Sequence, residues 1–227
     1  MMDHRSPANV TTRAAWLAGY DANVRGAADW IHASWHGTLA PLVTITRERA
    51  PELSSACSLL LLRRLRVPSP TLGDFDAIAN RLLALPVADM LRLLRIRALL
   101  CRRAELRHWI DRASRERLAS WTGADGSRAL SVLAALRDMP RARDLSRCAP
   151  VTPLAELSGD DVAWEGWCLF EREQIWSRTG PMCLSRLALA RDTAYPAWIE
   201  CTEVDGSGAM LLARLPSLFP EWSWLFG

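Results

Sequence analysis

"LRLLRIRALLCRRAELRHWI", residues 91–110, decides the fold class of this chain. Apolar residues recur in it every three or four positions, and arginines occupy most of the positions between them. This spacing is typical of an amphipathic α-helix with one face in a core. Pro86, just upstream, is a residue type that favours the first turn of a helix, so we expect the helix to open there. Its predicted apolar face consists of Leu93, Ile96, Leu99, Leu100, Leu106 and Ile110.

The same three- and four-residue spacing extends over most of the chain. Ser158, followed three residues later by Asp161, has the pattern of a capping box that starts another helix. Beyond Gly180 the pattern is less regular, and residues 198–204 and 209–215 are open to interpretation as strands or as helix turns. Further helices are predicted from Thr11 or Thr12 to about Trp35, from Pro51 to about Arg66, from Phe75 to Leu85, from Asp111 or Ser114 to Trp121, and from Ser127 to Leu136.

These patterns predict a mainly α fold: a single compact multi-helix domain with a less regular C-terminal part. Residues 138–157 are polar and rich in proline, which is typical of a long loop or a boundary. We therefore divide the chain into a helical body, residues 1–137, a loop or boundary, residues 138–157, and a helical or irregular part, residues 158–227, that packs on the body.

Composition is that of a globular protein: 50% of the 227 residues are hydrophobic, 23% are charged, and the net charge is +3. The six cysteines form no C-x-x-C pair and indicate reduced thiols rather than a disulfide framework. The N-terminus lacks the pattern of a signal peptide. The longest uncharged apolar run, near residues 56–62, is too short to span a bilayer. We expect a cytosolic protein.

Sequence signatures of catalysis are missing. All 28 basic residues are arginine, so a phosphate-binding loop with its lysine is excluded in its ordinary form. His32 and His36 would share a face of a helix, but the glutamate of a metalloprotease motif is replaced by alanine, and a helix-end role is favoured over a metal site. The adjacent Asp160 and Asp161 fit a helix N-terminus better than a catalytic pair. We predict no catalytic residue, no metal and no cofactor.

The 11 tryptophans fall mostly on predicted apolar faces. Trp222 and Trp224 differ, because they lie two residues apart at the end of the chain. They either pack against the body, the favoured interpretation, or anchor a partner, since tryptophan is enriched at binding hot spots. Core packing is predicted for Trp16, Trp30, Trp109, Trp121, Trp164 and Trp167.

Residues 95–123 contain eight arginines and three acids. A basic helical face can bind nucleic acid through phosphate contacts, and Arg102, Arg103, Arg107, Arg112, Arg115 and Arg117 would supply one. Interleaved acids can instead pair with these arginines along the helix, and no nucleic-acid-binding motif accompanies them. A solvated or partner-facing helix surface is favoured. The alternative is a nucleic-acid-binding or regulatory helical protein that uses the arginine-rich face of residues 92–117.

The stretch from residue 91 to residue 123 resembles the central signature of the SctK-type proteins of bacterial type III secretion systems, especially the Hrp branch. That signature has R-A-L-L, here residues 97–100, then R-R at 102–103, L-R at 106–107, I-D at 110–111 and a glycine, Gly123. Three further stretches agree with it: A-D-W-I-H-A-S-W near the N-terminus, L-G-D-F-D before the central helices, and L-F-P-E-W-S-W-L-F-G at the C-terminus.

The resemblance implies a non-enzymatic, mainly helical adaptor of the sorting platform at the cytosolic face of the inner membrane. Its partners would be the cytosolic domain of the ring protein SctD and the pod protein SctQ, with no small-molecule substrate, no nucleic acid and only indirect membrane association. Charge reversal of Arg102, Arg103 and Arg107 is expected to weaken one partner and leave the fold intact. The residues predicted to bind partners are Arg102, Arg103, Arg107, Arg112, Trp222 and Trp224.

Overall fold

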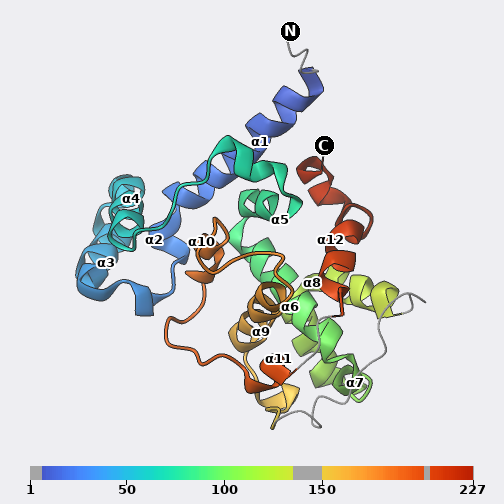
Figure 1. The fold of residues 1–227 in the computed structure, drawn as a ribbon. Coiled ribbons are helices and arrows are strands. Elements are labelled where there is room, and N and C mark those ends of the chain that lie inside the picture. Colours follow the sequence, from blue (N-terminus) through green and yellow to red (C-terminus); the bar gives the residue numbers. More distant parts are fainter. Residues whose placement is uncertain (1–6, 135–149, 202–204, 227) are drawn as a thin grey trace. The chain divides into compact units, whose positions relative to one another are not determined.

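The computed structural model describes residues 7–134, 150–201 and 205–226. Every regular element in these three ranges is an α-helix or a 3-10 helix (Figure 1), which confirms the predicted mainly α class. Two units pack internally: unit 1 comprises residues 1–90, 177–192 and 220–227, and unit 2 comprises residues 91–176 and 193–219. The predicted division at 138–157 stays a prediction, and residues 138–149 of it lie outside the described ranges.

Unit 1 is built from short helices around α1. The tryptophan of α1, Trp16, is 4% exposed and stacks on Phe75, with ring centroids 6.5 Å apart. The elements of the unit, in chain order, are α1 (Pro7–Arg25), α2 (Ala27–Trp30), η1 (Ala33–Trp35), η2 (Gly37–Leu39), α3 (Ala40–Arg49), η3 (Pro51–Leu53), α4 (Ser54–Arg64), η4 (Leu72–Asp76), α5 (Ile78–Arg81), η5 (Leu82–Ala84), α10 (Cys183–Arg186) and η8 (Pro220–Leu225).

The first predicted helix is interrupted. It was expected to run to Trp35, but α1 ends at Arg25, and Ile31 adopts extended backbone angles (φ −61°, ψ 129°) after the single turn of α2. The indole nitrogen of Trp30 donates a hydrogen bond of 2.8 Å to the carbonyl oxygen of Asn23 and so folds this turn back onto α1. The spacing of apolar residues cannot predict such a side-chain hydrogen bond, and so it did not predict the interruption.

Unit 2 is centred on α6 (Val87–Cys101), which begins directly after Pro86 as predicted, and on α9 (Gly159–Arg172). The two helices approach closely: a Cβ on Gly166 would lie 1.8 Å from the carbonyl oxygen of Leu94. Glycine is therefore the residue that permits this helix contact. The other elements are α7 (Arg103–Leu106), α8 (Arg112–Ala134), η7 (Leu154–Glu156), α11 (Ala197–Cys201) and α12 (Ser207–Leu218).

Residues that the sequence predicts to begin or end helices do so in unit 2. Ser158 and Asp161 form the predicted capping box of α9. Asp111 caps α8 by accepting a hydrogen bond of 2.9 Å from the backbone nitrogen of Ser114. Gly123, with φ of 70°, kinks α8 where the sequence predicts a helix end. The C-terminal stretches that were open between strands and helix turns are α11 and α12, while residues 202–204 lie outside the described ranges.

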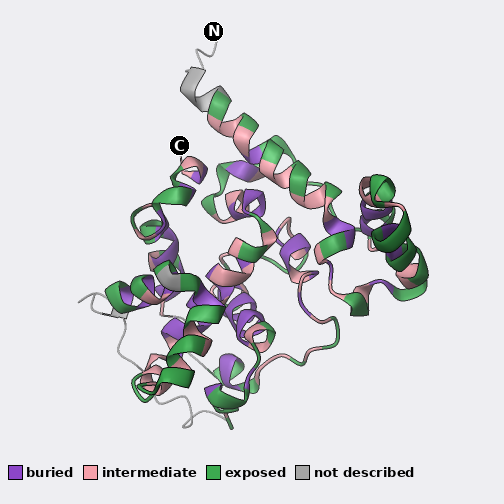
Figure 2. Cartoon of the chain, turned by 180° about the vertical axis from the view of Figure 1, so that it is seen from behind, coloured by how far each residue is buried: buried purple, intermediate pink, exposed green. Residues whose placement is uncertain are grey.

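Both units have apolar interiors. Residues of α6 and α9 form the centre of unit 2 and are largely buried (Figure 2). Trp167 of α9, 2% exposed, is one of several buried tryptophans in this unit. Of the tryptophans predicted for the core, Trp30 and Trp109 are only half-buried. The others, Trp16, Trp121, Trp164 and Trp167, are buried as predicted.

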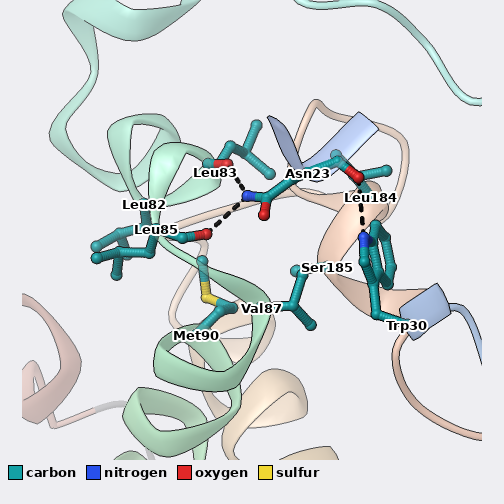
Figure 3. A pocket seen from close by; sticks show the side chains of 9 residues that line it. All are labelled: Asn23, Trp30, Leu82, Leu83, Leu85, Val87, Met90, Leu184 and Ser185. Carbon is teal, nitrogen blue, oxygen red and sulfur yellow. Dashed lines mark hydrogen bonds between the residues drawn. The ribbon is translucent and has the colours of Figure 1, made fainter. Parts of the chain in front are cut away.

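Unit 1 contains a small cavity of about 20 Å³ (Figure 3). The amide nitrogen of Asn23 donates to the carbonyl oxygens of Leu83 at 2.8 Å and Leu85 at 2.7 Å, so this nitrogen is engaged within the protein. Most of the remaining lining is aliphatic, including Val87 at the start of α6. The cavity is thus a local packing defect of about one water molecule's size.

Candidate partner-binding surfaces

Arg102 lies inside unit 2. Its side chain has 0% exposure and forms two hydrogen bonds to the carboxylate of Glu165 on α9, at 2.6 Å from Nε and 2.5 Å from Nη2. Nη1 donates to Glu105 at 2.8 Å and to the carbonyl oxygen of Thr152 at 3.1 Å. The indole nitrogen of Trp198 donates to the same Glu165 carboxylate at 3.0 Å. Arg102 therefore links three segments of unit 2.

The electrostatics of this site follow from burial. Removal from water by itself lowers the pKa of Arg102, but the hydrogen bonds and the charge of Glu165 outweigh it and raise that pKa, so the guanidinium stays protonated. Burial raises the pKa of the Glu165 carboxyl, and Arg102 and Trp198 oppose this rise by stabilising the carboxylate. Arg102 thus supports the charged form of Glu165, and Glu165 offsets the cost of burying the Arg102 guanidinium.

A second buried ion pair joins α6 to the C-terminal end of α9. Arg97, five residues before Arg102, donates from Nη2 to Glu173 at 2.7 Å, with side-chain exposures of 1% and 5%. Sequence reasoning did not identify the two glutamates as partners. The available signal was Glu165 within the apolar run of α9, where a charged residue is almost never buried unless it is paired.

Arg102 is consequently not part of an exposed arginine face. The expectation that its charge reversal leaves the fold intact is not retained, because a carboxylate at position 102 would face Glu165 in the interior. Arg103 is half-buried and donates from Nη1 to the carbonyl oxygen of Leu100 at 3.3 Å. Arg107 is exposed, and Arg112 is exposed with its Nε 2.7 Å from Glu116.

The turn between α7 and α8 contains an apolar residue among these cations. Ile110 is 71% exposed, so its predicted place on the apolar face of the central helix is wrong. The reason is that α7 ends at Leu106 and α8 begins at Arg112, so the helical spacing does not continue through residue 110. We name as the α7–α8 surface the exposed residues Arg107, His108, Ile110, Arg112 and Arg115.

The C-terminal tryptophans divide between core and surface. Trp222 is 2% exposed in η8, whose neighbour in unit 1 is α1. Trp224 is half-buried. The favoured interpretation, that this segment packs against the body, describes Trp222. The partner-binding role of both residues stays a prediction.

The two histidines serve helix ends. His32 accepts a hydrogen bond of 3.2 Å from the backbone nitrogen of Ser34. His36 is buried with its Nε2 3.1 Å from the carbonyl oxygen of Ile31, and burial lowers its pKa. No group of three or more histidine, cysteine or acidic residues suited to a metal ion occurs within the described ranges.

In the part of the chain that the structure describes, no helix combines the length and the apolar character needed to cross a bilayer.

Comparison with known proteins supplies the family. No curated protein and no solved structure matches the chain. The family model described as bacterial type III secretion protein (HrpB4) matches residues 7–221, a range that covers all of unit 2, most of unit 1 and the α7–α8 surface. The chain therefore belongs to the HrpB4 family of bacterial type III secretion proteins.

Proposed function

We propose that the chain is a non-enzymatic adaptor of the type III secretion sorting platform. In this role it links the cytosolic domain of the inner-membrane ring protein, SctD, to the pod protein, SctQ. It acts at the cytosolic face of the inner membrane and contacts the membrane only through the ring protein. Family membership supports a role within the secretion machine, and the resemblance of the central signature to SctK-type proteins supports this particular role.

The α7–α8 surface is the observation that carries the proposal. Ile110 is 71% exposed, and Arg107, three residues before it, forms no ion pair with any described residue. An exposed apolar side chain among cations is a combination found at protein interfaces, where arginine is enriched. The α7–α8 surface also contains Arg112, one of the residues that the sequence predicts to bind a partner.

The test is affinity purification of the tagged chain from its own bacterium, with identification of the proteins that accompany it. We expect both the ring protein and the pod protein. In a variant with Arg107→Glu and Arg112→Glu, recovery of one of them is expected to fall at least tenfold. Arg128→Glu is the matched control, because Arg128 is also exposed on α8 but lies beyond the kink at Gly123. Recovery of neither partner with the wild-type chain would refute the adaptor role.

The salt dependence of binding distinguishes the adaptor role from the alternative role in nucleic-acid binding. Binding through phosphate contacts loses affinity steeply as salt rises, in proportion to the number of phosphates neutralised. Arg97 and Arg102, two of the arginines in residues 92–117, are already paired with glutamates in the interior of unit 2. We therefore expect no salt-sensitive binding of duplex DNA or of RNA by the purified chain. A steep salt dependence of such binding would favour the alternative.

A further inference from the structure

Helix α4 of unit 1 carries large apolar side chains on two sides. Its inward side includes Leu61, which is 0% exposed. On the other side, Leu59 and Leu60 remain 51% and 45% exposed, and Leu53, just before the helix, remains 54% exposed. Figure 2 shows the α3–α4 pair at its right edge, with long exposed stretches. Two of the four leucines of α4 are thus left about half uncovered by the described residues.

Helical geometry gathers these residues on one face. Positions 56, 59, 60 and 63 are spaced three, four and seven residues apart and so project from the same side of α4. Scattered exposed leucines are ordinary, but a contiguous apolar stripe marks an interaction surface. We name as the α4 face the residues Leu53, Ala56, Leu59, Leu60, Arg63 and Arg64.

Cations gather at the C-terminal end of this face. Arg63, Arg64 and Arg66 are exposed, and none of them forms an ion pair with a described residue. Arg66 has φ of 53°, a conformation that favours glycine. Hydrogen bonds from Arg66 to Arg63 and from Val67 to Leu62 fix the chain at this point. Arginines near a helix C-terminus are favoured by the helix dipole, but the dipole does not explain the adjacent exposed leucines.

We propose that the α4 face is a second docking surface, whose occupant is an acidic amphipathic helix of a partner protein. The proposal rests on the proposed adaptor function, because a link between two proteins needs a second surface. Helix-in-groove recognition matches apolar anchors at three- and four-residue spacing. Acidic residues on the incoming helix would pair with Arg63 and Arg64, whose guanidinium groups have no counter-charge in the described chain.

Charge argues against one other occupant of the α4 face, and the extent of its apolar surface argues against another. A second copy would bring the same arginines to the interface, and Glu52 is the only acid at positions 50–66 that could offset them. A lipid surface would accept the arginines, but interfacial helices bury their apolar face about 5–10 Å into the bilayer. The exposed leucines of α4, Leu59 and Leu60, are already about half covered by their neighbours, so less apolar surface remains for such insertion.

The first test compares two aspartate substitutions at equally exposed sites. Leu60→Asp lies on the α4 face, and Ile78→Asp is the control, because Ile78 is 46% exposed in α5 of the same unit. The full-length tagged chain is purified from its bacterium as above. We expect Leu60→Asp to lower recovery of either the ring protein or the pod protein at least tenfold and to leave the other unchanged. The control is expected to retain both, and circular dichroism should show equal helix content.

The outcomes separate this inference from the proposed function. Loss of both partners from the wild-type chain would remove the adaptor role itself. A wild-type chain that recovers both, together with a Leu60→Asp variant that also recovers both, would overturn the α4 inference alone. Arg63→Glu with Arg64→Glu is expected to lower recovery of the same partner as Leu60→Asp by at least threefold.

Photo-cross-linking identifies the segment that covers the α4 face and shows whether it is acidic. A photo-reactive amino acid at position 60 of the full-length chain, activated in the bacterium, attaches to whatever covers the α4 face. We expect a peptide of the ring or pod protein with apolar residues three and four apart, flanked by aspartate or glutamate. A cross-link to a second copy of the chain, to lipid, or to a segment without acidic residues would overturn the proposal.

Discussion

Replacing Arg102 by methionine separates the buried role of this arginine from the partner-facing role that the sequence predicts. In the structure the substitution removes the cation that faces Glu165, which is 6% exposed, and leaves a carboxylate in the interior of unit 2. Breaking a buried ion pair by removing one partner costs about 3–5 kcal/mol. That is a large share of the stability of a typical domain, about 5–15 kcal/mol.

A second substitution isolates the uncompensated charge. Glu165→Gln in the Arg102→Met background removes the carboxylate but retains an oxygen that can accept from Trp198. We expect the double variant to recover about half of the lost stability or more, because no unpaired charge is then buried. The two changes are therefore strongly non-additive, as expected of residues in direct contact.

Urea unfolding followed by tryptophan fluorescence and by circular dichroism measures both effects. With a slope of about 2 kcal/mol per molar urea, the midpoint of Arg102→Met is expected to fall by about 2 M. A wild-type midpoint for Arg102→Met would refute the buried ion pair. The same conclusion would follow if Arg102→Met with Glu165→Gln were no more stable than Arg102→Met alone.

The loss of stability in Arg102→Met is expected to depend on pH, and the pKa of Glu165 gives the direction of that dependence. Arg102 holds down the pKa of Glu165 against the rise caused by burial, so its removal raises that pKa further. A carboxyl whose pKa is raised on folding stabilises the fold fully below its unfolded value and loses that contribution as pH rises through the folded value. The deficit of Arg102→Met relative to the wild type should be smallest near pH 4 and grow toward neutrality.

Gly166→Ala is expected to destabilise unit 2 by about 3 kcal/mol, because the added Cβ meets the backbone of Leu94. Gly73→Ala, whose Cβ would have its nearest neighbour at 3.8 Å, is the control, and urea midpoints compare the two. Arg66→Gly places glycine at a position with left-handed backbone angles, so the free energy of unfolding should stay unchanged or rise by up to about 1 kcal/mol. A lower urea midpoint for Arg66→Gly would show that the backbone at Arg66 is not strained. Val87→Ile extends a side chain toward the cavity of about 20 Å³; thermal unfolding should show a gain of at most about 0.5 kcal/mol.

Elements with local end signals could be predicted from the sequence. The start of α6 after Pro86 and the capping box of α9 depend on residues within four positions of each other, and both are present. The central apolar face was predicted correctly up to Leu100. It failed at Ile110, because the turn after α7 changes the phase of the helix and periodicity cannot detect that change.

The candidate surfaces were predicted only in part. Arg107 and Arg112 are exposed as a partner-facing surface requires. Arg102 could not be distinguished from them, because its counter-charge, Glu165, lies 63 residues away in the sequence. The α4 face was missed for a related reason: the run of leucines at residues 59–62 contains both buried and exposed positions, and only the packing of α4 in unit 1 decides which are which.

Geometry also gives a reason for arginine at position 102 that composition alone does not. A chain with no lysine suggests a coding bias, under which any cation would serve. At Arg102, however, three nitrogens of one planar group reach Glu165, Glu105 and the carbonyl oxygen of Thr152 at once. The single ammonium of lysine cannot reproduce that fork. Because Arg97 and Arg102 are neutralised inside unit 2 by Glu173 and Glu165, the two proposed docking surfaces depend instead on exposed arginines, Arg107 and Arg112 in the α7–α8 surface and Arg63 and Arg64 in the α4 face.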